Sequence, residues 1–421
     1  MYKLLLLIAF YLPFQLALNP VNGVDLASIR VLILALFCIW LAQGLKNKKI
    51  TIGNNLQTWL INSFLFLNLF SIIAAKNTDW SARKLLFLFS IFPVYFVASY
   101  LISTQKRMMQ IIRTLVFSGA IVAGIGIVQF AAQFIVGFQQ AYVFWAKHVI
   151  VPFLGQSFGE EVLKNPSWLV NIAGKTYLRA TSLFPDPHMF SFYLGLLAPL
   201  ALGLALSSKK QKILPFLFFT IILAADLLTF SRGGYVGLFA GLVFAGTFFW
   251  KKIRSRYRGI MMAAGVLILA VMLIPSPVSQ RFLSSFNLKE GSNQGRLAMW
   301  AKASDVTIGH PLIGVGIGNY PLEVVPTASY RDPIYAHNTY LDIAAETGIL
   351  NALIWIGILA VATAGFWKKA QENILFFFLT MSLVIFSAHS VVETALYSPV
   401  VLTLLLILIS LNKNIKNEKT S

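Results

Sequence analysis

The chain has 421 residues, of which 57% are hydrophobic and only 12% are charged. A water-soluble domain carries about 45–50% apolar and about 25% charged residues, so this composition excludes a soluble protein. The net charge of +19 could suit an acidic partner such as nucleic acid, but the basic residues lie between long apolar runs. We therefore expect a membrane protein that binds no nucleic acid. The single cysteine, Cys38, lies in an apolar run, which excludes a disulfide framework and a cysteine-based metal site.

A membrane-spanning helix needs about 20 mainly apolar residues. Twelve runs approach this length and predict an all-α, polytopic membrane protein of about twelve spans. The runs are 4–18, 27–45, 56–75, 85–103, 111–135, 189–206, 213–230, 233–250, 259–274, 341–366, 374–392 and 396–411. The first and the last two are short or weak. The first could instead be a signal peptide, although no cleavage site of small residues follows it.

Basic residues are distributed unevenly among the loops that join these runs. With the N-terminus inside, the inner loops hold 20 of the 34 Lys and Arg residues but only 2 of the 15 acidic residues. The positive-inside rule then predicts that both termini are cytoplasmic. The polar tail 412–421 is expected to be a disordered cytoplasmic extension.

Two long segments, 137–188 and 275–340, fall on the outer side of this topology. Each contains Trp, Pro and mixed charges, which favours a folded cap with short helices over a disordered loop. Spans 1 to 5 then occupy 1–136, spans 6 to 9 occupy 189–274 and spans 10 to 12 occupy 341–411. All the histidines lie in these outer segments or at outer helix ends: His148, His188, His310, His337 and His389.

The first candidate site is the sequence LTFSRGGYVGL at 228–238, where Arg232 interrupts a long apolar stretch. Ser231 is suited to cap the following helix, and Gly233 and Gly234 would permit a tight turn. A guanidinium beside a helix N-terminus forms an anion site. Alternatively, Arg232 belongs to an ordinary hairpin turn and pairs with Asp226.

Two further candidates lie in the outer segments. Residues 177–195 place Arg179, Asp186 and His188 just before a span, although an arginine in that position is common. Residues 293–320 place Arg296 and Trp300 four apart, so they share one helix face. The later sequence GVGIGN is a poor nucleotide fingerprint, because it lies in an outer loop; its glycines are expected to form turns.

The fourth candidate, residues 335–351, begins with His337 at the outer mouth of a span. If the helix starts near His337, Gly348 lies on nearly the same stripe and would let a neighbouring helix pack closely. Asp342 and Glu346 are acidic groups at shallow membrane depth, which makes them functional candidates. Alternatively, these acids pair with arginines of the loops.

Together, these four segments resemble the O-antigen ligase and O-antigen polymerase family. The ligase pattern is His, then Asn, Ser or Gln, nine residues, Gly, two residues and Gly, Thr or Tyr. His337, Asn338 and Gly348 match this pattern, whereas Asn351 departs from its last position. Further matches are Arg179 followed by Leu183, the SRGG sequence at 231–234, and Arg296 ahead of Trp300. The resemblance covers roughly residues 175–365.

The resemblance implies a glycosyltransferase in the bacterial inner membrane with an active site that faces the periplasm. It would move a glycan from undecaprenyl diphosphate to a sugar hydroxyl of lipid A core. The implied catalytic residues are His337 as the base, with Arg232 and Arg296 on the diphosphate. The implied substrate contacts are Arg179, Asn338, Ser231 and Trp300. This scheme requires no metal or other cofactor, although outer carboxylates could hold a metal, and direct attack would invert the anomeric centre.

Three alternatives share parts of this pattern. A polymerase uses the same donor but extends another carrier-linked chain. A protein O-glycan ligase would transfer to protein, but such enzymes are usually longer. A transporter tends to place charges at mid-membrane and to show two related halves, whereas the charged residues here crowd the outer face.

Overall fold

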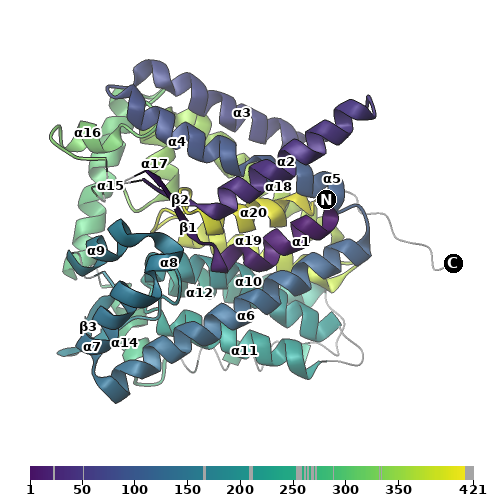
Figure 1. Ribbon diagram of the computed structural model, residues 1–421. Helices are drawn as coiled ribbons and strands as arrows, with labels where there is room; N and C mark the ends of the chain where they lie inside the picture. The colour runs from purple at the N-terminus through teal and green to yellow at the C-terminus, as the bar shows by residue number, and fades with distance from the viewer. Residues whose placement is uncertain are drawn as a thin grey trace.

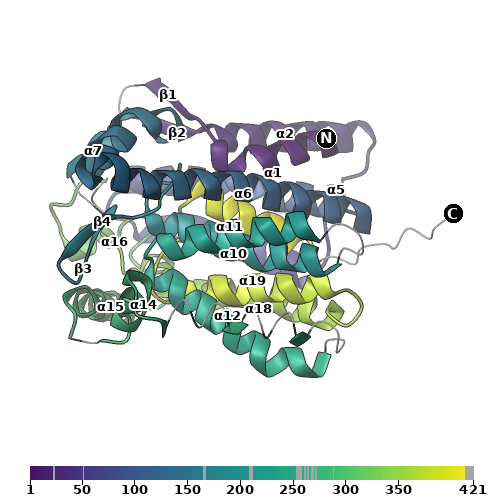
Figure 2. The same ribbon diagram turned by 90° about the horizontal axis from the view of Figure 1, so that it is seen from below.

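The computed structural model describes residues 1–412, apart from 22–23, 51, 165–166, 208–211, 253–257, 260–261, 263–264, 267–269, 271–272, 288, 331 and 333. Long helices lie side by side along one common direction (Figure 1). Short helices and two small β-ribbons gather at one end of the bundle, which we call the loop end (Figure 2). The N-terminus lies at the opposite end.

Six helical stretches among the described residues are long and apolar enough to cross a membrane. They are α2 (Ser28–Lys46), α3 (Leu56–Phe70) with η2 (Ser71–Ala74), α4 (Thr78–Ile91) with α5 (Pro93–Leu101), α6 (Gln105–Val136), α10 (Pro187–Ser207) and α18 (Ile349–Lys369). Shorter apolar helices are α1 (Tyr2–Tyr11) with η1 (Leu12–Phe14), α11 (Ile213–Leu228), α19 (Ile374–His389) and α20 (Pro399–Ser410). The expected run 233–250 lies within α12 (Arg232–Lys252).

The chain is therefore a mostly helical, multi-pass membrane protein, as its composition indicates. Most of the expected run 259–274 and almost all of the tail 412–421 lie outside the described residues. The number of spans and the orientation stay predictions.

The expected run 341–366 is not one continuous helix. It is divided at Gly348 into α17 (Thr339–Thr347) and α18. Gly348 has φ +89°, and a side chain there would overlap the backbone of Leu312. The nearby backbone of Pro311 accepts a hydrogen bond of 2.9 Å from the Ile349 N–H. The idea that Gly348 continues the helical stripe of His337 is therefore wrong, because a loop packs into the chain at this glycine.

Replacing Gly348 with alanine is expected to destabilise the protein. An L-residue with positive φ costs about 1–3 kcal/mol, and the added methyl group also collides with the Leu312 backbone. We expect a lower melting temperature in detergent and less folded protein in the membrane. Gly246 offers a matched control for size because open space surrounds it; an equal loss in both variants would contradict this role of Gly348.

The expectation of an all-α protein also needs a correction. β1 (Ala17–Val21) pairs with β2 (Val24–Ala27), and β3 (Leu169–Ile172) pairs with β4 (Lys175–Leu178), both antiparallel. In the second ribbon the turn residues Ala173 and Gly174 both have positive φ, as a tight hairpin turn requires. Such short ribbons leave only a weak alternation in the sequence.

Short helices occupy the two segments that were expected to be outer caps. The first segment contains α7 (Phe138–Phe144), the π-helix η3 (Trp145–Val149), α8 (Val151–Leu154) and α9 (Gln156–Lys164). The second contains α14 (Pro277–Ser284), α15 (Gly291–Gly309) and α16 (Tyr320–Val324). All of them lie at the loop end of the bundle (Figures 1 and 2).

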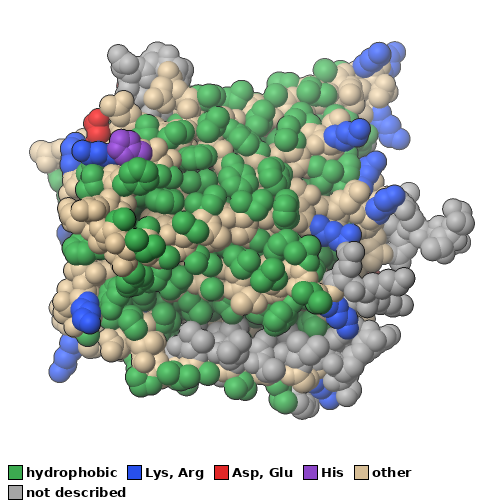
Figure 3. Space-filling view, turned by 60° about the horizontal axis from the view of Figure 1, so that its bottom comes forward, with side chains coloured by type: hydrophobic (Ala, Val, Ile, Leu, Met, Phe, Trp, Pro, Cys, Tyr) green, Lys and Arg blue, Asp and Glu red, His purple; other side chains and the backbone are tan. Residues whose placement is uncertain are grey.

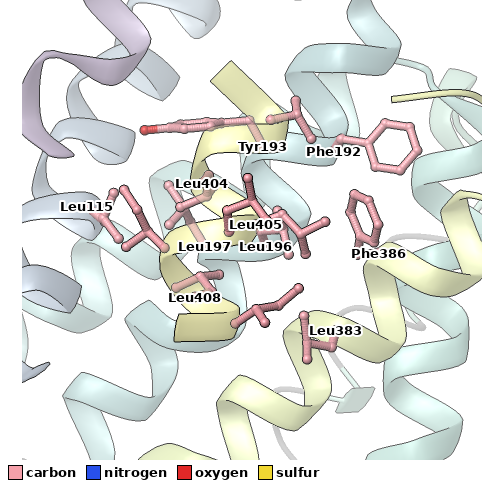
Figure 4. Close-up of a cluster of buried hydrophobic side chains, with 14 of the residues drawn as sticks. Leu115, Phe192, Tyr193, Leu196, Leu197, Leu383, Phe386, Leu404, Leu405 and Leu408 are labelled. Carbon is pink, nitrogen blue, oxygen red and sulfur yellow. The ribbon is translucent and has the colours of Figure 1, made fainter. Parts of the chain in front are cut away.

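The central helix of the bundle is α10, whose apolar window is entirely buried. Its Phe192, Leu196 and Leu197 pack among leucines of α6 and α20 and against Phe386 of α19 (Figure 4). The outer surface between the two ends is largely apolar, whereas Lys and Arg gather at the ends (Figure 3). Membrane helices associate mainly through such close packing. The packing holds the start of α10 rigidly at the loop end.

Candidate active site

Polar side chains from five separate segments gather at the loop end. His188 is the second residue of α10, Arg232 is the first residue of α12, and Arg296 lies in the first half of α15. His337 lies two residues before α17, and Glu393 lies four residues after the end of α19. Each of these five segments therefore places one functional side chain in the same region.

His337 forms the closest contact of this group. Its Nδ1 lies 2.7 Å from Oε1 of Glu393, and no described residue bonds its Nε2. The backbone of His337 has φ +50°, in the left-handed region that residues other than glycine seldom adopt. Burial lowers the pKa of the imidazole, but the hydrogen bond and the charge of Glu393 raise it by more. The resulting pKa lies above the usual value of histidine.

Glu393 is surrounded by cationic and potentially cationic groups although only 3% of the residue is exposed. Its Oε2 lies 3.6 Å from Nη2 of Arg296 and 3.7 Å from Nδ1 of His188. Burial raises the pKa of the carboxyl, whereas His188, His337 and Arg296 together lower it by more. The pKa therefore lies well below its usual value, so Glu393 carries a negative charge at neutral pH.

His188 connects this pair to the start of α12. Its Nδ1 lies 2.9 Å from the hydroxyl oxygen of Ser231, which also accepts a hydrogen bond of 3.2 Å from the Gly234 N–H. Ser231 thus caps α12, as the sequence predicts. Asp186 caps the start of α10 by accepting hydrogen bonds from the N–H groups of His188 and Met189. Burial raises the Asp186 pKa to about 6, although these bonds oppose the increase.

Arg232 pairs with Glu290 and not with Asp226, the partner that a simple hairpin turn would give it. Asp226 instead accepts a hydrogen bond of 2.5 Å from Ser191. The Arg232 guanidinium is almost fully buried and forms a two-pronged ion pair with Glu290. Its Nη1 also donates to Oδ1 of Asn293 at 2.7 Å. Arg232 is therefore directed toward α15, the helix that carries Arg296.

Arg179 has a different environment. Its guanidinium donates to three backbone carbonyl oxygens, those of Ser167, Thr229 and Phe230. Burial, together with the nearby Arg281, lowers the Arg179 pKa to about 9. The side chain ties the chain before α10 to the turn between α11 and α12.

Residues 216–356 match the family model described as O-antigen ligase. The match covers about a third of the chain and assigns this segment to the O-antigen ligase family. The chain is accordingly a membrane enzyme of the kind that transfers lipid-linked glycans. No curated protein matches the chain.

The matched segment contains Arg232, Arg296 and His337, but ends before Glu393. Glu393 was not predicted from the sequence. A signal for it exists in the sequence HSVVETALYSPV at 389–400, where it is the sole carboxylate between the last two apolar runs. Arg281 and Glu290, which pair beside Arg232, were not predicted either.

The glycines of the SRGG sequence serve a different purpose from the one expected. Gly233 and Gly234 lie inside the first turn of α12, and neither has positive φ. A side chain on Gly233 would overlap the His389 ring, and one on Gly234 would overlap the Ser191 hydroxyl. The tight-turn interpretation is wrong, because these glycines permit close packing of α12 against α19 and α10.

Asn338 and Trp300 were expected to contact substrate. The Asn338 side chain accepts hydrogen bonds from the N–H groups of Tyr340 and Leu341 and so caps α17. Trp300 lies on α15, one turn after Arg296, and its indole N–H is buried with no hydrogen-bond partner among the described residues. Trp300 therefore keeps a free donor near the site, whereas Asn338 fixes the start of the helix after His337.

The two acids of α17 hold the segments that carry the histidine and its partner. Asp342 accepts hydrogen bonds from the Ala336 N–H, at 2.7 Å, and from the Thr394 hydroxyl. Glu346 pairs with Lys84 at 2.7 Å and accepts a bond from Tyr397. Asp342 therefore connects Ala336, the neighbour of His337, to Thr394, the neighbour of Glu393. Glu346 pairs with a lysine of α4, and not with an arginine of the loops, which was the alternative.

Proposed function

We propose that the protein transfers a glycan from undecaprenyl diphosphate to a sugar hydroxyl of lipid A core at the periplasmic face of the inner membrane. The observation that supports this most is the His337–Glu393 pair beside Arg296, next to the buried Arg232. Such a site combines a base with groups that bind an anion. The reaction needs both.

His337 acts as the base in this scheme. Glu393 accepts a hydrogen bond from Nδ1–H, which leaves the lone pair of Nε2 available to the acceptor. Nε2 takes the proton of the acceptor hydroxyl while that oxygen attacks the anomeric carbon. The bond from this carbon to the diphosphate oxygen breaks, and undecaprenyl diphosphate leaves. A single displacement inverts the anomeric centre.

Arg232 and Arg296 bind the diphosphate and stabilise the charge that grows on it as the bond breaks. Arg179 supports them indirectly, because its donors already bind backbone carbonyls. Ser231 orients His188, and Trp300 offers its free indole N–H to the glycan. The scheme uses no metal or other cofactor.

The orientation belongs to the same proposal. At the end of the bundle opposite the loop end, the charged side chains in view are Lys and Arg, whereas the loop end also shows acidic and histidine side chains (Figure 3). This asymmetry favours cytoplasmic termini and a periplasmic loop end. Labelling of single cysteines, introduced at exposed His310 and at Lys49 in a Cys38→Ser background, tests it. Position 310 should react with an impermeant thiol reagent in intact spheroplasts and position 49 only after lysis.

The acceptor is tested in a strain that lacks the gene. On a lipopolysaccharide gel, loss of all long chains while carrier-linked polymer persists supports the ligase. A core that bears a single repeat unit indicates the polymerase instead. Unchanged lipopolysaccharide with altered glycoprotein indicates transfer to protein, and substrate uptake into proteoliposomes without glycan transfer indicates a transporter.

Replacing Arg232 with lysine is expected to lower kcat/KM for the donor about 10- to 100-fold, because one ammonium group cannot reproduce a two-pronged guanidinium contact. Purified enzyme with a titrated lipid-linked donor provides the measurement. Lys175→Arg, at an exposed position of β4, is the matched control for an exchange of basic side chains. Wild-type kinetics of Arg232→Lys would contradict a diphosphate contact.

A further inference from the structure

Glu290 is paired with the Arg232 guanidinium, the same group that the proposed mechanism assigns to the diphosphate of the donor. Both carboxylate oxygens of Glu290 pair with the two terminal nitrogens of Arg232. Oε1 also lies 3.7 Å from Nη1 of Arg281, a residue of α14. One carboxylate therefore lies between two arginines, in the position of an anionic ligand.

This carboxylate can leave more easily than the arginines can. The Glu290 side chain is 31% exposed, whereas that of Arg232 is 3% exposed and that of Arg281 is 16% exposed. Glu290 is also the N-cap residue of α15, yet its side chain makes no capping hydrogen bond. Release of the side chain would leave the helix cap unchanged, and the buried arginines would remain in place.

A carboxylate and a phosphate present paired oxygens to a guanidinium in the same way. We propose that Glu290 is an internal competitor that the diphosphate of the donor displaces, and that Arg281 is a further diphosphate-binding residue beside Arg232. This inference rests on the proposed function, because it assumes a diphosphate-linked donor.

The charges around Glu290 favour replacement of its carboxylate by another anion over departure of the carboxylate alone. Burial, together with the nearby Arg232, lowers the Arg281 pKa to about 10, so this side chain remains cationic at neutral pH beside the cationic Arg232. Departure of Glu290 alone would leave these two cations facing each other at close range. A diphosphate brings about two negative charges in place of one, so its arrival compensates for the loss of the carboxylate. In the absence of an anionic ligand, the Glu290 carboxylate therefore stays paired with the two arginines.

The experiment measures binding of undecaprenyl diphosphate to the purified full-length chain in nanodiscs. Glu290→Gln removes the competing charge and is expected to tighten binding about threefold to tenfold. Arg281→Gln is expected to weaken it by about tenfold, and the double variant should return near the wild type. Melting temperatures of the same samples report whether each variant remains folded.

Glu323→Gln is the matched control, since this carboxylate belongs to the same segment, 275–340, and pairs with Lys76. It should leave binding within about twofold of the wild type, because long-range charge effects are screened. Unchanged or weaker binding by folded Glu290→Gln overturns the proposed role of Glu290 as a competitor. Wild-type affinity in Arg281→Gln overturns the additional contact. If the wild type binds the lipid and transfers glycan in these cases, the proposed function stands; if it does neither, both proposals fail.

Discussion

Replacing His337 with alanine is expected to lower the rate of glycan transfer by about 10²- to 10⁴-fold, the usual contribution of a positioned general base. The reason is geometric: Glu393 holds Nδ1 at 2.7 Å, and Nε2 is left without a partner among the described residues. The measurement is transfer by purified enzyme at saturating donor and acceptor. Immunoblots of the membrane fraction and a melting curve confirm that the variant is present and folded.

His310→Ala is the matched control. His310 also lies in the segment 275–340, but it is exposed and follows the end of α15. This variant should retain nearly normal transfer. If His337→Ala transfers glycan at a rate near that of the wild type, His337 is not the base. A loss of melting temperature in His337→Ala alone would instead point to a structural role of the His337–Glu393 pair.

The membrane class and most helices could be predicted because uncharged apolar runs of spanning length are typical of membrane helices. The division of 341–366 at Gly348 could not be predicted, since it depends on contact with the backbone at 311–312. These residues are distant from Gly348 in the sequence. Likewise, the purpose of Gly233 and Gly234 depends on which helices become neighbours. Local sequence describes a helix well, but it does not tell which element packs against it.

The candidate site shows the same limit. Arg232 and His337 stand out because each polar residue interrupts or borders an apolar run. Glu393 also lies between apolar runs, yet it becomes a candidate only once α19 is placed beside α10 and α12. Arg179 shows the opposite case: the family resemblance implies a substrate contact for it, whereas its donors bind backbone carbonyls. Partners of polar groups are set by tertiary structure, and these partners separate a binding role from a structural one.

Replacing Glu393 with glutamine is expected to lower transfer by about 10²-fold or more and to change its pH dependence. The neutral amide no longer enforces the tautomer that leaves Nε2 free, so the base is wrongly protonated in part of the population. The charge and the hydrogen bond of Glu393 raise the His337 pKa, whereas burial and Arg296 lower it. Loss of the charge therefore lowers the His337 pKa.

The sign of the pH effect follows from the role of the base. His337 must be neutral to accept a proton, so kcat/KM of the wild type falls as the pH drops below the raised pKa of His337. In Glu393→Gln this acid limb should move to lower pH, even though the maximum rate is smaller. Glu160→Gln, an exposed change on α9, should alter neither property. A purely structural role of Glu393 would reduce the rate without moving the limb, and a limb that moved to higher pH would contradict the pairing of Glu393 with the base.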